Sequence, residues 1–429
     1  MGRASYFETG EPRDCRGCEA CVQVCPVSEI TMAADGEGFR YPVINSEACV
    51  ACGRCRQVCN GAVEEALFHD PAARRAFGGA IADAEVLADS TSGGAFTAIA
   101  SAFLREGEGS VFGAVAHGVS GARHACVTTE EGLSAFHGSK YAQSEVGSAY
   151  SDAGARLRSG GRVLFSGTPC QIAGLRSYLG ELASSDGLLT VEVVCEGVPS
   201  PLFIKKQIED VSNRHLGGEP VTSMRYRDKW GALHVTRGPF SSASRADSWD
   251  FEPVSFSSGA RRWAVDRWVN PFWNIWLRHL MSRPSCYECP YARGERVADV
   301  TLGDLWGVHL YCPDLYNDDR GASLVVCSTE KGLAAVQAAA PLMRPFRELD
   351  VAVAIRYQGP MRAPIAENPD RVAFMADLRA MGYRELVRKW ARRPSLKLLV
   401  SKYIWGTNRQ VCARKTRSAV RGGVQGGQE

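Results

Sequence analysis

Two cysteine runs near the start of the chain share one spacing, C-x2-C-x2-C-x3-C. The first run is Cys15, Cys18, Cys21 and Cys25, and the second is Cys49, Cys52, Cys55 and Cys59. Three thiolates on such a loop reach three irons of a cubane, and the fourth cysteine ligates the neighbouring cluster. The spacing therefore predicts two [4Fe–4S] clusters. The first set of ligands is Cys15, Cys18, Cys21 and Cys59, and the second set is Cys49, Cys52, Cys55 and Cys25.

Disulfides and zinc sites are the alternative uses of these cysteines. A zinc site pairs one C-x2-C with a distant second pair, so a third cysteine two residues on has no role there. Disulfides need an oxidising compartment, and the first residues lack the apolar segment of a signal peptide. No uncharged apolar run reaches the ~18 residues of a membrane span. We therefore expect a cytoplasmic protein whose thiols bind iron.

The rest of the chain predicts a mixed αβ architecture, because candidate strands alternate with candidate helices. With 429 residues, the chain is long enough for about two or three domains. We expect a dicluster ferredoxin module at residues 1–70, a linker over 71–89 and a helical pattern from about Pro341 onward. The fold class is therefore α+β. The strands are expected at 111–116, 163–166, 189–194, 298–302 and 323–327, and the helices at 94–105, 145–157, 171–179 and 202–211.

The C-terminal tail is basic. From Leu386 to Gln428 there is no acidic residue, and lysines and arginines alternate with apolar and aromatic residues. This pattern is typical of an amphipathic helix on an anionic membrane or an acidic partner, and membrane association is then peripheral. It is equally typical of a solvated, partly disordered end. No motif for nucleic-acid binding is present.

One cysteine outside the two runs lies at a helix start. In Ser166-Gly167-Thr168-Pro169-Cys170-Gln171, Thr168 is a candidate N-cap, Pro169 suits the first helical position and Gln171 completes a capping box. Cys170 then lies in the first turn, where the helix dipole stabilises a thiolate. Ser92-Gly93-Gly94 is a second helix start whose amides could approach a phosphate, although such a turn by itself is weak evidence.

Four further cysteines form a plausible third set. Cys170 and Cys195 follow two candidate strands, and Cys286 and Cys289 form a C-x2-C pair. If adjacent strand ends bring them together, they could hold a third [4Fe–4S] cluster, and zinc would accept the same ligands. The other cysteines are expected to be small buried hydrophobic residues. These are Cys126, Cys312, Cys327 and Cys412.

Five segments, in this order, resemble the coenzyme F420-reducing hydrogenase/dehydrogenase beta subunit family. They are Ser92-Gly93-Gly94, Ser139-Lys140-Tyr141-Ala142-Gln143-Ser144, Phe165-Ser166-Gly167-Thr168-Pro169-Cys170-Gln171, Cys195-Glu196-Gly197-Val198-Pro199-Ser200 and Thr301-Leu302-Gly303-Asp304-Leu305-Trp306-Gly307. The resemblance covers roughly residues 84–345. It implies a family N-terminal region at 84–170, a family C-terminal region at 171–345 and a separate helical tail at 346–429.

The resemblance implies an iron–sulfur flavoprotein in which electrons pass between FAD, the clusters and a hydride donor or acceptor, with a redox partner protein. It places the third set on the family's cysteine positions. It also nominates twelve candidate flavin residues: Ser92, Gly93, Gly94, Ser139, Lys140, Tyr141, Gln143, Gly167, Thr168, Gly303, Asp304 and Trp306. Glu196 stands where many members have His, which weakens a catalytic role there.

The residues themselves allow other interpretations. Lys140 could place a cation beside a flavin or pyrophosphate, or lie in a solvated loop. Asp304 follows a strand, where αβ proteins build sites, but it could simply cap a helix. The aromatic residues from Trp263 to Trp276, which include Trp268, are expected to be core. A flavin-free electron-transfer subunit is the alternative function, while a thiol nucleophile at Cys170 or a radical enzyme is disfavoured.

Overall fold

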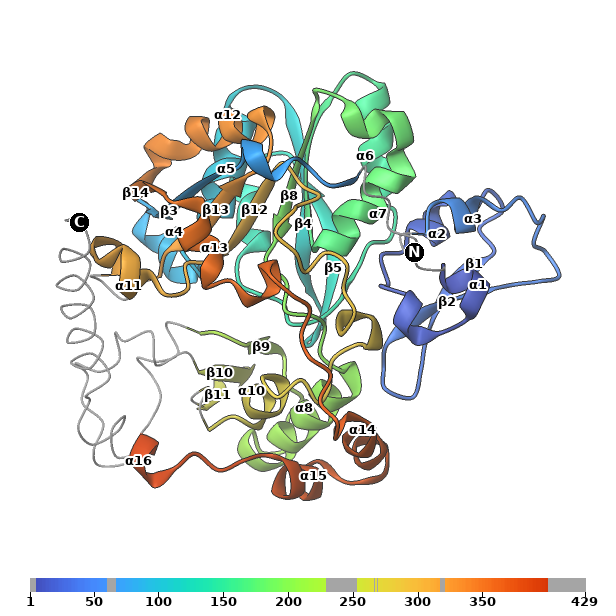
Figure 1. The fold of residues 1–429 in the computed structure, drawn as a ribbon. Helices are drawn as coiled ribbons and strands as arrows, with labels where there is room; N and C mark the ends of the chain where they lie inside the picture. Colours follow the sequence, from blue (N-terminus) through green and yellow to red (C-terminus); the bar gives the residue numbers. More distant parts are fainter. Residues whose placement is uncertain are drawn as a thin grey trace, which may run out of the picture.

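The computed structural model describes residues 5–59, 67–228 and 253–399, apart from residues 266, 268 and 317–320 (Figure 1). Its central element is a nine-stranded sheet with the order β14-β3-β13-β12-β8-β7-β4-β5-β6. Strands β4, β7, β8 and β12 run parallel to one another, and β13 pairs with β12 and β3 in antiparallel fashion. The strands are β3 (Arg75–Ile81), β4 (Gly109–His117), β5 (Gly121–Val127), β6 (Ser144–Glu145), β7 (Arg162–Gly167), β8 (Leu188–Val193), β12 (Val300–Asp304), β13 (Ser323–Cys327) and β14 (Met343–Leu349).

Helices cover both faces of this sheet, which explains why its central strands are apolar almost throughout. Successive side chains of a strand point to opposite faces. Along β7, Leu164 therefore packs into one core, while Val163 and Phe165 pack into the other. The first core lies under α5 (Ala95–Arg105) and α12 (Glu330–Ala339), and the second lies under α6 (Ala149–Arg158) and α7 (Pro169–Leu179).

A third layer lies at one end of the sheet (Figure 1). It contains a small antiparallel sheet of β9 (Ser223–Arg225), β10 (Val254–Ser258) and β11 (Arg261–Val265). The helices of this layer are α8 (Pro201–His215), α10 (Pro271–Trp276), α14 (Arg371–Ala380) and α15 (Tyr383–Trp390). Aromatic residues form its core, and Phe272, Trp273 and Trp276 of α10 are buried there. This confirms that these aromatic residues are core, although Trp263 lies on β11 and Trp268 lies outside the described residues.

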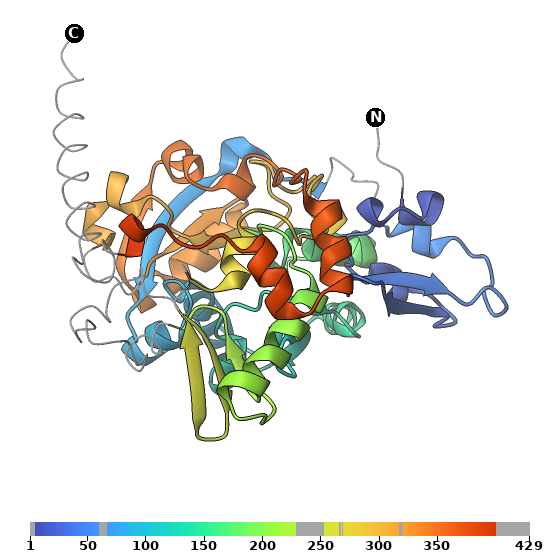
Figure 2. The same ribbon diagram turned by 90° about the horizontal axis from the view of Figure 1, so that it is seen from below.

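The N-terminal module contains α1 (Tyr6–Thr9), α2 (Ala20–Val24), α3 (Arg54–Gln57) and the antiparallel pair β1 (Ile30–Ala34) and β2 (Arg40–Ile44). Both views place it at one side of the larger body (Figure 1, Figure 2). Helix α2 packs on α7, and Gly174 allows the close approach, because a Cβ there would lie 3.0 Å from the Cβ of Cys18.

A second contact fixes the module through Glu37. Its carboxylate pairs with Arg371 of α14 at 2.7 Å, and its backbone oxygen accepts a hydrogen bond from the Ser200 hydroxyl at 2.7 Å. Arg371 and Glu37 are largely shielded from water, at 9% and 16% side-chain exposure, so screening by salt is weak there. The module is therefore attached to segments from the middle and the end of the chain.

The five expected strands and four expected helices are all present, with ends shifted by a few residues. Two expectations were wrong. The segment 71–89, expected to be a linker, contains the interior strand β3. Gly78 and Gly79 interrupt the apolar run by which such a strand is recognised in a sequence. A Cβ at Gly79 would lie 2.5 Å from the Pro345 oxygen, so close strand contact requires this glycine. The helical pattern expected after Pro341 is interrupted by β14, whose alternating charged residues suit an exposed edge strand.

Helices resume in the tail with α13 (Val351–Arg356), α14, α15 and the short α16 (Leu396–Leu399). The basic residues beyond position 399 lie outside the described part of the chain. Among the residues that the structure describes, no helix is both long enough and apolar enough to cross a membrane.

A buried ion pair holds β8 to the loop before β12. Nε of Arg296 donates to Oε1 of Glu192, and the two side chains are 2% and 0% exposed. The same oxygen accepts a hydrogen bond from the Thr301 hydroxyl at 2.8 Å. Removing one member leaves an uncompensated buried charge. We therefore expect Arg296→Met to lower the free energy of unfolding by about 3–5 kcal/mol in anaerobic urea titrations.

The matched control is Arg75→Met, which removes an exposed pair with Glu348 on β14. Exposed pairs contribute little, because water screens both charges. The control should shift the unfolding midpoint only slightly, and equal effects of the two substitutions would contradict the prediction.

Candidate functional site

The first set of cysteines converges on one cavity of the N-terminal module. Cys15, Cys18 and Cys21 come from the loop and helix around α2, and Cys59 comes from the second run, after α3. All four line the same cavity, together with α1 residues and Met32 of β1. The structure thus brings the last cysteine of the second run to the first three cysteines of the first run. This donor set fits a cubane cluster, whose ligands are four cysteine thiolates.

Burial dominates the chemistry of three of these thiols. Removal from water raises the pKa of Cys18 and of Cys21, and the charges of neighbouring cysteines raise both further. Burial also raises the pKa of Cys15, although the Arg283 guanidinium opposes this shift. Metal binding to such thiols must release their protons, so the metal supplies the positive charge that the thiolates need.

The second set lies nearer the surface. Cys49 and Cys52 are exposed, while Cys25 and Cys55 are half-buried against the core that includes α7. The pKa of Cys55 is raised by burial and by the charges of Cys52 and Cys49, which places these three thiols near one another. The charge of Cys55 also raises the pKa of Cys21, so the first and second sets are neighbours.

The third set gathers at the carboxyl ends of two parallel strands. Cys170 begins α7 after β7, Cys195 follows β8, and Cys286 and Cys289 come from the loop after α10. Burial raises the pKa of Cys195 strongly, and the charges of Cys286, Cys170 and Cys289 add to this shift. The four thiols therefore lie within electrostatic reach of one another inside the protein.

The helix start at Cys170 has the expected capping box, in which the amide of Thr168 donates to Oε1 of Gln171 at 3.1 Å. The expected thiolate is not favoured, however. Burial raises the pKa of Cys170 more than the 3.2 Å contact with the Thr168 hydroxyl lowers it. Desolvation outweighs the helix terminus because the sulfur is withdrawn from water.

The first and third sets meet where α2 packs on α7. The charge of Cys170 raises the pKa of Cys18, and the two thiols come from these two helices or their flanking loop. Within the described ranges, no three His, Cys, Asp or Glu side chains are placed to hold a single metal ion. The ligands of a cubane differ in this respect, because they bind separate irons.

Three of the segments with candidate flavin residues meet at the carboxyl edge of the nine-stranded sheet. The Ser92 hydroxyl and the Leu305 amide both donate to the oxygen of Ala322, each at 3.0 Å. The Ser139 amide donates to the Thr91 hydroxyl at 2.7 Å. The segments 91–94, 139–140 and 303–306 are therefore joined, at the edge where αβ proteins build sites.

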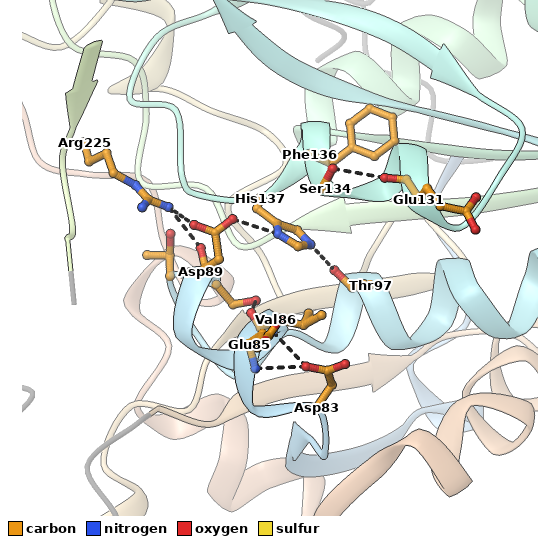
Figure 3. A network of polar contacts seen from close by, with 12 residues as sticks. Asp83, Glu85, Val86, Asp89, Thr97, Glu131, Ser134, Phe136, His137 and Arg225 are labelled. Atoms are coloured by element: carbon orange, nitrogen blue, oxygen red, sulfur yellow. Dashed lines mark hydrogen bonds and ion pairs between the residues drawn. The ribbon is translucent and has the colours of Figure 1, made fainter. Parts of the chain in front are cut away.

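A polar network lies beside these segments (Figure 3). His137 is bound through Nδ1 to Asp89 at 2.9 Å and through Nε2 to the Thr97 hydroxyl at 3.2 Å. Arg225 of β9 pairs with the same Asp89 from the opposite side. Burial raises the pKa of Asp89, but the hydrogen bonds from Arg225 and His137 outweigh burial and leave the pKa lowered.

Lys140 is a nearby cation. Its Nζ donates to the backbone oxygens of Phe136 and His137 at 2.8 and 2.9 Å. Burial lowers the pKa of Lys140 to about 8, and the charge of Asp89 opposes the shift. The ammonium is therefore held by neutral carbonyl groups at a site that receives little water.

The remaining candidate flavin residues have varied surroundings. Asp304 pairs with Arg227 at 2.6 Å, while Trp306 is 47% exposed. Gly167 and Thr168 adjoin Cys170, and Gly303 packs on Val194, the neighbour of Cys195. Gly94 begins α5 at φ +73°.

Three candidates have a structural explanation. A Cβ at Gly93 would lie 2.5 Å from the Gly79 oxygen. Tyr141 packs among the aromatic rings of the third layer. The side chain of Gln143 points to the N-terminal module, where it donates to the oxygens of Arg16 and Gly17 at 2.6 and 3.0 Å.

Several polar residues at these sites were not predicted from the sequence. Arg225 and Arg227 pair with Asp89 and Asp304, whereas the intervening Tyr226 is buried. This alternation of period two could have indicated a strand with one charged face. Arg283 had no local pattern, because its side-chain hydrogen bonds are with residues more than a hundred positions away.

Two parts of the chain match known protein families. Residues 160–342 match the family model for the C terminus of the coenzyme F420 hydrogenase/dehydrogenase beta subunit. Residues 14–63 match the 4Fe-4S dicluster domain. No curated protein matches the sequence.

Among solved structures, a chain of the F420-reducing [NiFe] hydrogenase complex from Methanosarcina barkeri, studied as a xenon derivative, is similar at 19% identity and a TM-score of 0.42. The alignment covers 77% of the present chain and 99% of that chain. From the two family matches, the chain joins an N-terminal 4Fe-4S dicluster domain to the C-terminal domain of the coenzyme F420 hydrogenase/dehydrogenase beta subunit family.

Proposed function

We propose that this iron–sulfur protein is a flavin-dependent oxidoreductase that moves electrons between a hydride donor or acceptor and a redox partner protein. One observation carries the proposal: three sets of four cysteines follow one another from the surface to the carboxyl edge of the sheet. The second set is partly exposed, the first set lies beside it with three of its four cysteines buried, and the third set adjoins the first.

This order suits stepwise electron transfer. Exposed Cys49 and Cys52 would let a partner approach the second set, while Cys15, Cys18 and Cys21 of the first set are buried and the cysteines of the third set are half-buried. Gly303 packs on Val194, beside Cys195, so the third set adjoins the segments that we assign to the flavin. In this proposal, the chain's own contribution is to keep the sites in a fixed sequence and to exclude water from the inner ones.

The joined segments 91–94, 139–140 and 303–306 are the proposed FAD site. A bound flavin supplies chemistry that links hydride exchange with single-electron transfer to clusters. Lys140 would offer a positive charge to a phosphate or to the electron-rich edge of the ring system. The Arg225–Asp89–His137 network would hold the surrounding loops in place (Figure 3).

A flavin-free electron-transfer subunit is the second candidate. The observation that favours it is that Gly93, Tyr141 and Gln143 already have roles in packing or in holding the N-terminal module. In that case the partner protein would perform the hydride chemistry, and this chain would only conduct electrons.

Iron, sulfide and flavin content decide between these possibilities. Protein purified without oxygen should contain about twelve irons per chain, since each cube holds four. It should also contain about one flavin. Clusters without flavin would favour the second candidate, and colourless or zinc-loaded protein would contradict both.

The third set has its own test. Cys286→Ser should reduce the iron content from about twelve to about eight, because one cube loses a ligand. The matched control is Cys126→Ser, a half-buried cysteine of β5 outside all three sets, which should leave the iron content unchanged. Equal iron content in both variants would contradict a cluster at the third set.

Flavin binding should depend on the charge of Lys140. Because the folded-state pKa of Lys140 is lowered to about 8, its ammonium is present below that pH and is lost as the pH rises through it. Fluorescence titration should therefore give FAD affinity that falls above about pH 8. Lys140→Arg keeps its charge throughout this range, so its affinity should stay constant. The same fall in both proteins would exclude Lys140 as the cause.

A further inference from the structure

Among the buried groups, Arg283 has surroundings that the proposed function leaves unexplained. Its side chain is 1% exposed. Nε donates to the oxygen of Cys15 at 3.0 Å, and Nη1 donates to Oε1 of Gln143 at 2.9 Å. Nη2 donates to the oxygen of Arg40 at 2.9 Å and lies 3.4 Å from Sγ of Cys15. The guanidinium thus contacts both the backbone oxygen and the sulfur of one ligand of the first set.

Arg283 has no carboxylate partner in the described ranges, unlike the buried Arg296 and Arg371. Its other close neighbours are aromatic, with the guanidinium carbon 4.4 Å from the ring centre of Tyr41. An arginine stays charged in proteins. A buried charge is costly unless an opposite charge compensates for it. Cys15 carries the sulfur that can provide this charge once it becomes a thiolate.

We propose that Arg283 is a positioning residue that raises the reduction potential of a cluster held by the first set, an inference that rests on the proposed function. Reduction adds one negative charge to a cluster, so a fixed positive charge nearby favours the reduced form. Hydrogen bonds to the cluster sulfurs and net charge are the terms by which proteins adjust these potentials. In the shielded interior, this charge acts with little screening.

Among the described residues, no group equivalent to Arg283 contacts the second set. Cys49 and Cys52 are exposed, and in the part of the chain that the structure describes no side chain donates a hydrogen bond to a sulfur of the second set. The nearby Arg54 and Arg56 are exposed, where water and salt screen their charges. The inference therefore predicts different potentials for the two ferredoxin clusters, with the inner one more easily reduced.

The position of Arg283 also couples the first set to the third. Its backbone oxygen accepts a hydrogen bond from the Cys286 amide at 2.9 Å, at the start of the C-x2-C pair. Arg283 thus contacts the first set through its side chain and the third set through its backbone.

The test is an anaerobic redox titration of the full chain, followed by electron paramagnetic resonance. We expect Arg283→Met to lower the midpoint potential of one cluster by about 59 mV or more, which is a tenfold fall in the equilibrium constant for one-electron reduction. The affected signal should be the one that Cys59→Ser removes. Arg283→Lys should recover part of the potential, since it restores the charge without the guanidinium fork. The control Arg54→Met should leave this potential unchanged.

Each outcome is decisive. Unchanged potentials in an Arg283→Met protein with full iron content would overturn the inference and leave the proposed function standing. Absence of clusters from the unsubstituted protein would overturn the proposed function itself. If Arg283→Met cannot hold iron, Arg283→Gln provides the uncharged variant. If neither uncharged variant holds iron, iron binding by Arg283→Lys would show that a positive charge is needed at this position and would support the inference. Loss of iron from Arg283→Lys as well would show that Arg283 has a structural role only.

Discussion

The packing of α2 on α7 is the contact on which the arrangement of the sites depends. Gly174 brings the two helices close enough for Cys18 and Cys170 to influence each other electrostatically. A larger side chain at this position would push the N-terminal module away from the sheet. The separation of the first and third sets would then increase, and under the proposed function electron transfer between them would slow.

Local sequence rules explain a large share of the fold and of the metal chemistry. The repeated cysteine spacing indicated a dicluster module, which the family comparison confirms. Strands β4, β7, β8, β12 and β13 were found because each is a short apolar run bounded by turn residues. The helix start at Thr168 was found because its capping box involves residues only three positions apart.

Features that depend on distant contacts were not predictable in the same way. Strand β3 was missed because its glycines interrupt the apolar run. These glycines are needed where β3 closely approaches β14 and other segments, and a local sequence pattern does not show which segments will pack there. Arg283 meets Cys15 across 268 positions of the chain, and Arg225 meets Asp89 across 136. The lowered thiolate character of Cys170 likewise depends on burial by segments far away in the sequence.

The attachment of the N-terminal module at Glu37 has a mechanical consequence. Arg371 of α14, the Ser200 hydroxyl and the side chain of Arg283 bind the module from three different segments of the larger body. These attachments oppose a swing of the module between a docking position and an internal acceptor. Under the proposed function, delivery of each electron would then be governed by the approach of a carrier to the outer face, and not by a hinge within this polypeptide.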